Sequence, residues 1–563
     1  MIAGTRAVFL AIDVEPEARA GLLGFAIGRV AANGDCDWLE GSKVFPTVVP
    51  HPAPKDKFPT DRHPIQSLIW SDFEALPGKA VKYRVQPMYG SPTAPQLRAG
   101  VEVEARTEDP TQGTHGIYFN RGAIASQAFS EHFQNKPPKD EDDPSDPEVV
   151  WLARGTLKAA LDYIGRAQAG DELRVAAYEF TYVPILLALK AAAARGVHVG
   201  IVHEAGTETN PKTKAKVLTS ASKTAAKAIS KLGLDKQANL TLIDRTKRAN
   251  IPHNKFIVWI SGGKAREVLA GSANFTSSGF IGQTNVVHIV RDEGVAQEYL
   301  DYWEQLALDP TSPELAKWTT AHTPPDQLDA RTASPGITTF FSPRENDDML
   351  DWYATRIRGA ADTVMFTAAF GVNKTLADEF GVPRPFVRFI LLEDEPDAKL
   401  NAAMAKDPNV SAAYGSILAD YAKGKKAFPA TSLDEWFLKE ELFRKQGFVF
   451  FIHTKFLLID PLGEDPMVFT GSANFSTNSL TENDENMLLI RGDTSVADIY
   501  LSEFDRIFRH FQAREKINKT AEQGGSLTDA KFLREDESWL DDYVKAGTLR
   551  SNRQRLFFPA WPH

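Results

Sequence analysis

The sequence predicts an α/β protein in which two copies of one domain follow a small β-rich domain. Three observations support this fold class. Roughly the first hundred residues are rich in Pro and Gly and carry short apolar runs, some of which alternate apolar with polar residues. From about residue 150 onward, helical segments alternate with apolar strand-like segments, which is typical of layered α/β proteins. A stretch of the chain also repeats at an offset of 200 residues.

The β-rich domain is expected at residues 1–133 and to resemble a β-sandwich. Residues 81–85 and 101–105 alternate apolar with polar side chains, as half-buried strands do. A short helical stretch around 122–133 closes the domain. Residues 135–147 then combine four prolines with five acids, which neither a helix nor a central strand tolerates. We therefore expect an exposed linker at 134–149.

The first lobe is expected at 150–325 and the second at 326–517. Within the first, the pattern predicts helices at 155–168 and 183–194 and strands at 173–178 and 197–202. A similar order recurs in the second lobe, with a helix at 347–360, strands at 363–368 and 387–392, and a segment around Leu376 between them. The remaining residues, 518–563, form a tail whose aromatic side chains are expected to pack back on the body: Trp539, Phe557, Phe558 and Trp561.

The repeat is clearest where residues 253–291 are placed over residues 453–491. The two stretches align without a gap, and His, Lys, Phe, Gly-Ser-Ala-Asn-Phe and Arg coincide. So many polar residue types in register are improbable by chance, and we infer a duplicated domain.

Each copy carries the same set of polar side chains. His and Lys stand two residues apart where a buried strand begins, so both side chains leave the strand by the same face. A Gly-Ser-x-Asn turn after the next short strand adds a hydroxyl and an amide. Ammonium, amide and hydroxyl groups beside an imidazole suit an oxyanion such as phosphate. These candidates are His253, Lys255, Ser272 and Asn274 in the first copy and His453, Lys455, Ser472 and Asn474 in the second.

These motifs resemble those of the phospholipase D superfamily, in which His-x-Lys is followed by four residues, Asp, and then Gly-Ser-x-Asn. The second copy matches in full and includes Asp460, whereas the first has Ile260 in place of the acid. The resemblance covers roughly residues 150–515. It implies two α/β/α sandwich lobes related by a pseudo-twofold axis, with both motifs in one cleft. It also implies hydrolysis or transfer of a phosphodiester through a covalent phosphohistidine, without a metal or other cofactor.

Roles follow from this chemistry. His253 is expected to be the nucleophile and His453 the general acid and base, while the lysines and Asn274 and Asn474 hold the non-bridging oxygens. Both serines and Asn285 are expected to contact substrate. Glu485 stands 32 residues after His453, and Asn285 stands 32 residues after His253. We expect Glu485 to hold His453 and raise its pKa, and Asn285 to orient His253.

Asp460 has two interpretations. The family motif groups it with the catalytic residues. Alternatively, it is structural and bonds the backbone at the end of its strand.

The substrate is less determined than the chemistry. A phospholipid headgroup is favoured, with aromatic residues ahead of the second motif taking up acyl chains: Trp436, Phe437, Phe448, Phe450 and Phe451. Residues 212–248 contain ten Lys or Arg against two acids, which suits either a lipid surface or a nucleic acid. A nuclease and a phosphate-binding scaffold without turnover are therefore the alternatives.

Composition sets further bounds. The net charge of −10 means that average charge does not draw the protein to nucleic acid or to anionic membranes. Cys36 is the single cysteine and forms no internal disulfide. Neither a signal peptide nor an apolar run of about 18 residues is recognised. We expect a cytoplasmic protein that makes transient contact with a membrane surface. A monomer is favoured, although the sequence does not determine the oligomeric state.

Overall fold

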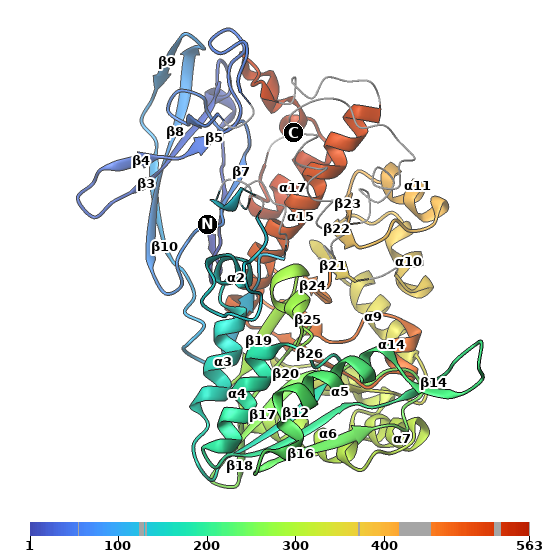
Figure 1. Ribbon diagram of the computed structural model, residues 1–563. Helices are drawn as coiled ribbons and strands as arrows, with labels where there is room; N and C mark the ends of the chain where they lie inside the picture. The colour runs from blue at the N-terminus through green and yellow to red at the C-terminus, as the bar shows by residue number, and fades with distance from the viewer. Residues whose placement is uncertain are drawn as a thin grey trace.

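The computed structural model describes residues 1–53, 56–122, 129, 132–134, 136–369, 372–415, 452–522 and 531–561. Two sheets of three and five strands form the N-terminal part, drawn in blue in Figure 1, and two seven-stranded sheets form the core of the rest. Of the N-terminal sheets, one has the order β1-β2-β7 and the other has the order β10-β8-β3-β4 with β9 added to β8. Their strands are β1 Ile2–Ala3, β2 Val8–Ala11, β3 Gly24–Val30, β4 Cys36–Trp38, β7 Ile69–Asp72, β8 Ala80–Ser91, β9 Ala94–Leu97 and β10 Val101–Arg106. A 3-10 turn, η1 Pro16–Ala18, and a short ladder of β5 Glu40–Gly41 with β6 Phe58–Pro59 complete this part.

The C-terminal tail completes the core of the N-terminal sheets. Its elements are η7 Glu537–Leu540, α16 Asp541–Val544 and α17 Leu549–Phe557. Trp539 and Trp561 are buried in one cluster with Val8, Ile27 and Tyr83 from the sheets. The Trp539 indole also donates a hydrogen bond of 2.8 Å to the Leu22 carbonyl. The two ends of the chain therefore share a single hydrophobic core.

The first lobe is built on a seven-stranded sheet of order β11-β19-β18-β17-β12-β13-β16. Strands β12, β13 and β16 run parallel, and the other neighbours are antiparallel. The strands are β11 His115–Phe119, β12 Glu172–Ala177, β13 His198–Glu204, β16 Leu240–Arg245, β17 Lys255–Ser261, β18 Lys264–Gly271 and β19 Val286–Val290. The helices are α2 Pro147–Ala153, α3 Thr156–Arg166, α4 Val183–Ala194, α5 Ser220–Leu232, η2 Leu234–Lys236, η3 Ser278–Gly282, α6 Glu293–Ala307 and α7 Ser312–His322.

The second lobe has a seven-stranded sheet of order β20-β26-β25-β24-β21-β22-β23. Its strands are β20 Gly336–Ser342, β21 Thr363–Ala368, β22 Val387–Leu392, β23 Val410–Tyr414, β24 Phe456–Ile459, β25 Met467–Gly471 and β26 Glu485–Arg491. Its helical elements are η4 Pro325–Gln327, α8 Leu328–Arg331, α9 Asp348–Arg358, α10 Lys374–Gly381, α11 Ala398–Lys406, α14 Thr477–Thr481 and α15 Thr494–Glu522. Place by place, this sheet has the strand order and the directions of the first one. The predicted α/β fold with two related lobes is confirmed.

The layers of the two lobes meet in one central core. Helices α3 and α4 cover the outer face of the first sheet, and α9 and α10 cover the outer face of the second. The inner faces share a core with α6 and α15, where Tyr299 and Phe504 lie with Val258 and Leu458. In the part of the chain that is described, no helix is long and apolar enough to span a membrane.

One strand lies in a different sheet from the one the sequence suggested. Strand β11 was expected within the N-terminal domain, but it pairs with β19 through Ile117↔His288 and Phe119↔Val286. It fills the edge position that β20 fills in the second lobe, and Phe119 contacts Tyr500 of α15 at 5.2 Å between ring centroids. The partner strand is remote in sequence, so local patterning carries no sign of this pairing.

Candidate active site

The two motif histidines lie at equivalent positions in the two lobes, each just before the first residue of a central strand. His253 precedes β17 and His453 precedes β24, and their exposed fractions are only 5% and 6%. Chain segments of the two lobes touch here, because Thr284 and Ile452 form a β-bridge and the Thr284 hydroxyl accepts a hydrogen bond from the His453 amide at 3.0 Å. Both motifs therefore reach the seam between the lobes.

Glu485 of the second lobe holds the histidine of the first. The His253 Nδ1 atom lies 2.8 Å and 2.9 Å from the two carboxylate oxygens of Glu485. The Asn483 amide donates to the same carboxylate at 3.1 Å. Because Nδ1 is held by an acceptor, the Nε2 atom of His253 is the ring nitrogen left for chemistry.

Asn285 of the first lobe holds the histidine of the second. Its Oδ1 atom lies 2.8 Å from the His453 Nδ1 atom and accepts a further hydrogen bond of 2.8 Å from the Ser272 hydroxyl. The Asn285 amide nitrogen donates to the Gly279 carbonyl at 2.8 Å, which turns the amide oxygen toward the ring. His453 is thus oriented by a neutral acceptor, whereas His253 is oriented by a carboxylate.

The pairing expected from the spacing within each copy was wrong. Glu485 holds His253 and not His453, and Asn285 holds His453 and not His253. The physical reason is that the two copies are related by symmetry across a seam. A partner at the same offset in either copy satisfies the same pattern, so sequence spacing does not distinguish a contact within a lobe from one between lobes.

The two lysines lie beside the histidines in a desolvated position. The ammonium groups of Lys255 and Lys455 donate to the backbone carbonyls of His253 and His453, the second at 2.6 Å. Burial lowers the pKa of Lys255 to about 8, and it lowers the pKa of Lys455 well below its usual value, with repulsion from Lys255 adding to the effect. These lysines are therefore poised to gain free energy from a bound anion.

Burial controls the protonation of the imidazoles as well. It lowers the pKa of both His253 and His453 well below the usual value, and each ring is lowered further by both lysines. Burial also raises the pKa of Glu485 to about 7. Each histidine is also hydrogen-bonded to a residue of the opposite lobe, which indicates that the two motifs form a single site.

The turn residues divide into two kinds. The amide oxygens of Asn274 and Asn474 are buried without a hydrogen-bond partner among the residues described. By contrast, the completely buried hydroxyls of Ser272 and Ser472 accept hydrogen bonds from the Val286 and Asn486 amides at 3.1 Å and 3.0 Å. These hydrogen bonds hold the two turns. The Asn285 side chain likewise has partners, in His453, Ser272 and Gly279. Contact of these three side chains with substrate stays a prediction.

Asp460 lies at the opposite end of β24 from His453. Its carboxylate accepts three backbone hydrogen bonds, from Ala361 and Asp362 at 2.8 Å and from Thr363 at 3.0 Å. Its backbone has φ 47°, a conformation that Asp adopts more readily than most residues. Asp460 is therefore structural, and its place among the candidate catalytic residues was wrong.

Sequence reasoning missed two side chains of the site, Tyr178 and Glu179. The Tyr178 ring lies 5.3 Å from that of His253, and the Lys255 ammonium lies 5.7 Å from the Tyr178 ring centroid. Burial raises the pKa of Tyr178 to about 12. Glu179 accepts a hydrogen bond of 2.5 Å from the Asn274 amide. Both residues directly follow β12. Because β12 and β17 are antiparallel, the end of β12 at Ala177 lies beside Lys255 at the start of β17. The position of Tyr178 and Glu179 just after a strand could therefore have indicated them.

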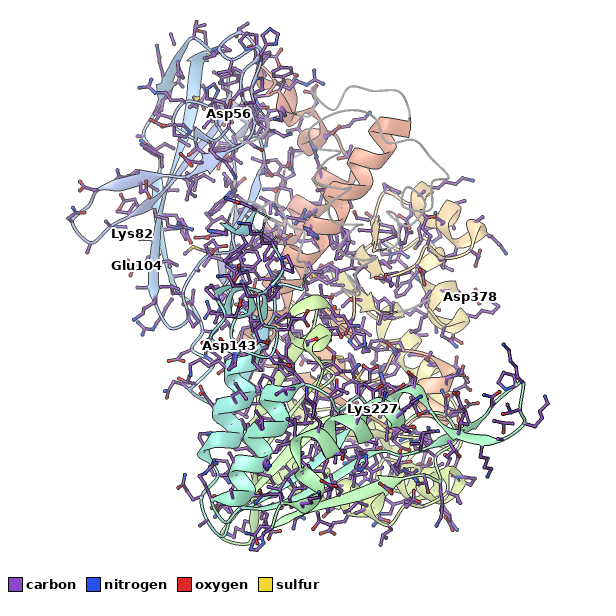
Figure 2. The ribbon with its side chains drawn as sticks, viewed as in Figure 1. Asp56, Lys82, Glu104, Asp143, Lys227 and Asp378 are labelled. Carbon is purple, nitrogen blue, oxygen red and sulfur yellow. The ribbon has the colours of Figure 1, made fainter. Side chains whose placement is uncertain are left out.

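The basic segment divides in the structure. Its exposed part is a hairpin of β14 Thr207–Thr209 and β15 Lys216–Leu218, followed by α5, whose Lys227 is labelled in Figure 2. The side chains of Arg245 and Arg248 are instead buried, where Arg245 pairs with Asp484 and Arg248 pairs with Glu204. The aromatic residues proposed for acyl chains, Trp436, Phe437, Phe448, Phe450 and Phe451, lie outside the described residues.

A family model described as "Cardiolipin synthase, PLD-like domain" matches residues 161–307 and 424–508. These segments contain both His-x-Lys motifs and both Gly-Ser-x-Asn turns. This match confirms the predicted resemblance to the phospholipase D superfamily. Members of this superfamily act on phosphodiesters, which agrees with the enzyme class expected from the sequence.

Solved structures with similar chains include a phospholipase D family member, a phosphatidylserine synthase and a polyphosphate kinase. The family member Nuc from Salmonella typhimurium is 27% identical over 26% of this chain and 84% of its own, with a TM-score of 0.20. Phosphatidylserine synthase from Haemophilus influenzae is 11% identical over 64% and 85%, with a TM-score of 0.39. Polyphosphate kinase from Porphyromonas gingivalis is 13% identical over 61% of this chain, which spans only 46% of that protein, with a TM-score of 0.35. No curated protein matches the sequence.

Proposed function

We propose that this phospholipase D-like protein cleaves a phosphodiester through a covalent phosphohistidine, with a phospholipid as its substrate. The observation that carries the proposal is the crossed arrangement at the seam, in which His253 is held by Glu485 and His453 by Asn285. This arrangement makes the two imidazoles chemically different although the motifs around them are the same.

His253 is the nucleophile in this proposal. Its Nδ1–H donates to Glu485, so the Nε2 lone pair attacks phosphorus and the bond from phosphorus to the leaving oxygen breaks. The ring becomes positively charged when Nε2 bonds to phosphorus, and the Glu485 carboxylate stabilises that charge. A neutral partner in place of Glu485 gives no such stabilisation.

His453 is the proton donor and then the acceptor. Its partner, Asn285, is neutral, so a proton on Nε2 is held less strongly than beside a carboxylate. The negative charge of a bound phosphodiester offsets the lysine charges that lower the pKa of His453 and favours its protonated form. The ring then gives this proton to the leaving oxygen. It regains one from the water or alcohol that attacks phosphohistidine.

The remaining polar groups bind the non-bridging oxygens. Lys255 and Lys455 supply positive charge. Their attraction to the phosphoryl oxygens becomes stronger as negative charge builds on those oxygens in the transition state. The amide groups of Asn274 and Asn474 orient the same oxygens. Because the lysines are buried, their electrostatic contribution is larger than in water.

Two features favour a phospholipid. Tyr178 borders His253 with an aromatic face, and Glu179 adds a carboxylate beside Asn274, a combination suited to a hydroxyl or ammonium group of a lipid headgroup. The hairpin of β14 and β15 starts after Glu204 and exposes Val217 and Leu218 next to lysines. Apolar and cationic side chains together are typical of segments that contact anionic lipid surfaces.

A nuclease is the second candidate, favoured by the same exposed lysines. Lys212, Lys214 and Lys216 on the hairpin suit the phosphates of a nucleic acid. The carboxylate of Glu179 beside the site opposes this interpretation, because it repels a chain of phosphates. The two substrates are separated by measuring headgroup release from mixed micelles and nicking of plasmid DNA with the same preparation.

The test of the chemistry is turnover of bis(p-nitrophenyl) phosphate in the presence of a chelator. We expect activity in the wild type and its loss in both His253→Ala and His453→Ala. His198→Ala, at an exposed histidine at the start of β13, is the matched control and is expected to keep full activity. A protein that binds phosphate without any turnover would be a scaffold and would refute the proposal.

A further inference from the structure

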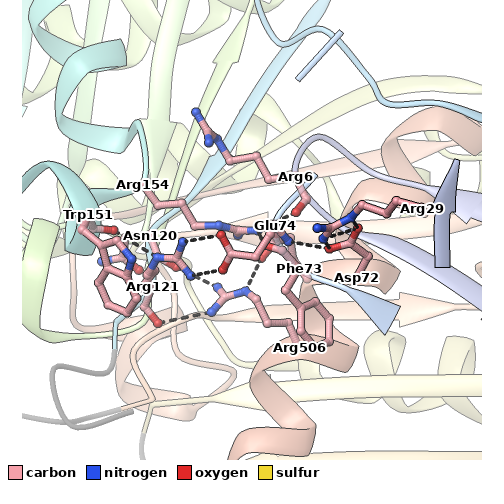
Figure 3. A network of polar contacts seen from close by, with 11 residues as sticks. Arg6, Arg29, Asp72, Phe73, Glu74, Asn120, Arg121, Trp151, Arg154 and Arg506 are labelled. Carbon is pink, nitrogen blue, oxygen red and sulfur yellow. Dashed lines mark hydrogen bonds and ion pairs between the residues drawn. The ribbon is translucent and has the colours of Figure 1, made fainter. Parts of the chain in front are cut away.

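A pocket of about 450 Å³ lies between the N-terminal domain and the first lobe. It is lined by side chains of α2 and α3 and by arginines from three separate segments of the chain: Arg6, Arg121 and Arg154. Figure 3 shows these arginines together with Arg506 of α15. None of these residues takes part in the histidine site.

Three of the four arginines have partners. Arg154 is buried, pairs with Glu503 at 2.6 Å and donates to the Arg6 carbonyl at 2.8 Å. Arg506 pairs with the same Glu503 at 2.7 Å. Arg121 lies 4.0 Å over the Trp151 ring and pairs with Glu74 at 3.2 Å. A single buried carboxylate, Glu503, therefore serves two arginines.

Arg6 is different, because its guanidinium has no hydrogen bond or ion pair within the described part of the chain. The side chain is partly buried, and in Figure 3 it points away from the dashed contacts of its neighbours. Burial lowers the pKa of Arg6, repulsion from Arg154 and Arg121 lowers it further, and attraction to Glu503 and Glu74 offsets only part of this fall. A partly buried cation among other cations, without a partner, is an unfavourable arrangement in the absence of an anion.

The start of α3 adds positive potential at the same place. The Arg6 Nη2 atom lies 3.9 Å from the position that a Cβ atom would take on Gly155, the residue before this helix. Gly155 supplies no side-chain cap, so the first amides of α3 lack the usual acceptor. Free amides at the start of an 11-residue helix attract anions, and Arg6 stands next to them.

The acids near the pocket do not neutralise it. Asp162 is paired with Lys158 at 2.5 Å on the surface of α3, and Glu74 is 56% exposed. The rest of the lining is apolar and includes Leu157, Leu161 and the largely exposed Val150. The pocket thus combines an unpaired cation and helix amides on one side with an aliphatic wall on another.

We propose that this pocket binds a phosphate monoester that carries an apolar group, with Arg6 and the first turn of α3 holding the phosphate. A phosphate oxygen accepts hydrogen bonds from a guanidinium and from helix amides at once. The aliphatic wall takes the apolar part of the ligand. The site is separate from the histidines and belongs to the junction of the N-terminal domain with the first lobe.

Calorimetric titration of the full-length protein tests the proposal with three probes: inorganic phosphate, dihexanoyl phosphatidate and dihexanoylglycerol. Phosphatidate is expected to bind more tightly than inorganic phosphate, and dihexanoylglycerol, which lacks phosphate, is expected not to bind. Arg6→Gln should bind one equivalent fewer than the wild type, since loss of one charge-assisted contact weakens binding roughly ten- to hundredfold. Arg62→Gln, at an exposed arginine of the same domain, should bind as the wild type does.

Thermal unfolding distinguishes a ligand site from a structural role of Arg6. Without phosphate, Arg6→Gln should unfold at the same or a higher temperature than the wild type, because it relieves repulsion. It should also lose part of the stabilisation that phosphate confers. Leu161→Glu, which supplies a carboxylate for Arg6 from α3, should likewise abolish binding at this site. Unchanged phosphate stoichiometry and affinity in both variants, or a clear destabilisation of Arg6→Gln in phosphate-free buffer, would overturn the proposal.

Discussion

Replacing Glu485 with Gln is the most informative perturbation of the crossed site. The substitution keeps the shape of the side chain and removes the charge that lies 2.8 Å from the His253 Nδ1 atom. Hydrogen bonds that involve a charged group contribute about 1.5–3 kcal/mol, against about 0.5–1.5 kcal/mol for neutral pairs. The difference of about 1–2 kcal/mol corresponds to a roughly five- to thirtyfold slower formation of phosphohistidine.

The pH dependence gives a second, independent readout. Burial raises the pKa of Glu485 to about 7, so the carboxylate is protonated below that pH and charged above it. The wild-type kcat/KM should therefore rise as the pH increases through about 7. Glu485→Gln has no group to ionise there and should lose this rise.

The assay is single-turnover cleavage of two esters that differ in their leaving group. A p-nitrophenyl ester needs little protonation as it departs, whereas an alkyl ester depends on the proton from His453. Glu485→Gln should slow both esters by the same factor, because its partner is the nucleophile. Glu482→Gln, at an exposed acid in the turn before β26, is the control and should behave as wild type. A defect in Glu485→Gln confined to the alkyl ester would refute the assignment. It would mean that Glu485 assists protonation of the leaving group and not nucleophilic attack by His253.

Three further predictions concern the rest of the protein. Burial lowers the pKa of Lys255 to about 8, so above this pH Lys255 loses the charge that holds the phosphoryl oxygens and kcat/KM should fall. Lys255→Arg should move this fall in kcat/KM to higher pH. Asp460→Ala should lower the free energy of unfolding by about 1–2 kcal/mol through lost backbone hydrogen bonds, with kcat unchanged at low temperature. Arg245→Ala, which leaves the buried Asp484 charge without its partner, should cost about 3 kcal/mol or more and be visible in urea unfolding.

Much of the site was predictable because its chemistry resides in short local patterns. The repeat identifies both His-x-Lys pairs and both turns, and strand periodicity places each pair at the start of a buried strand. The bounds of β21, β22 and α4 coincide with the segments expected from hydrophobic pattern alone: 363–368, 387–392 and 183–194.

The contacts between lobes were not predictable in the same way. The partners of His253 and His453 lie on the opposite lobe, and a duplicated sequence places an equivalent residue at the same offset in both. The edge strand β11 pairs with β19, far along the chain. The arginine pocket likewise draws Arg6 and Arg154 from remote segments. Such features depend on three-dimensional packing, which local propensity does not encode.

The most direct test of the central claim is to trap the covalent intermediate. In His453→Ala, a p-nitrophenyl diester should still react with His253, because its leaving group needs no proton, while the second step lacks its base and stalls. Mass spectrometry of the quenched and digested protein should then find the phosphoryl group on the peptide that contains His253. Finding no phosphorylated peptide while p-nitrophenol is released, or finding the group on another residue, would contradict the account.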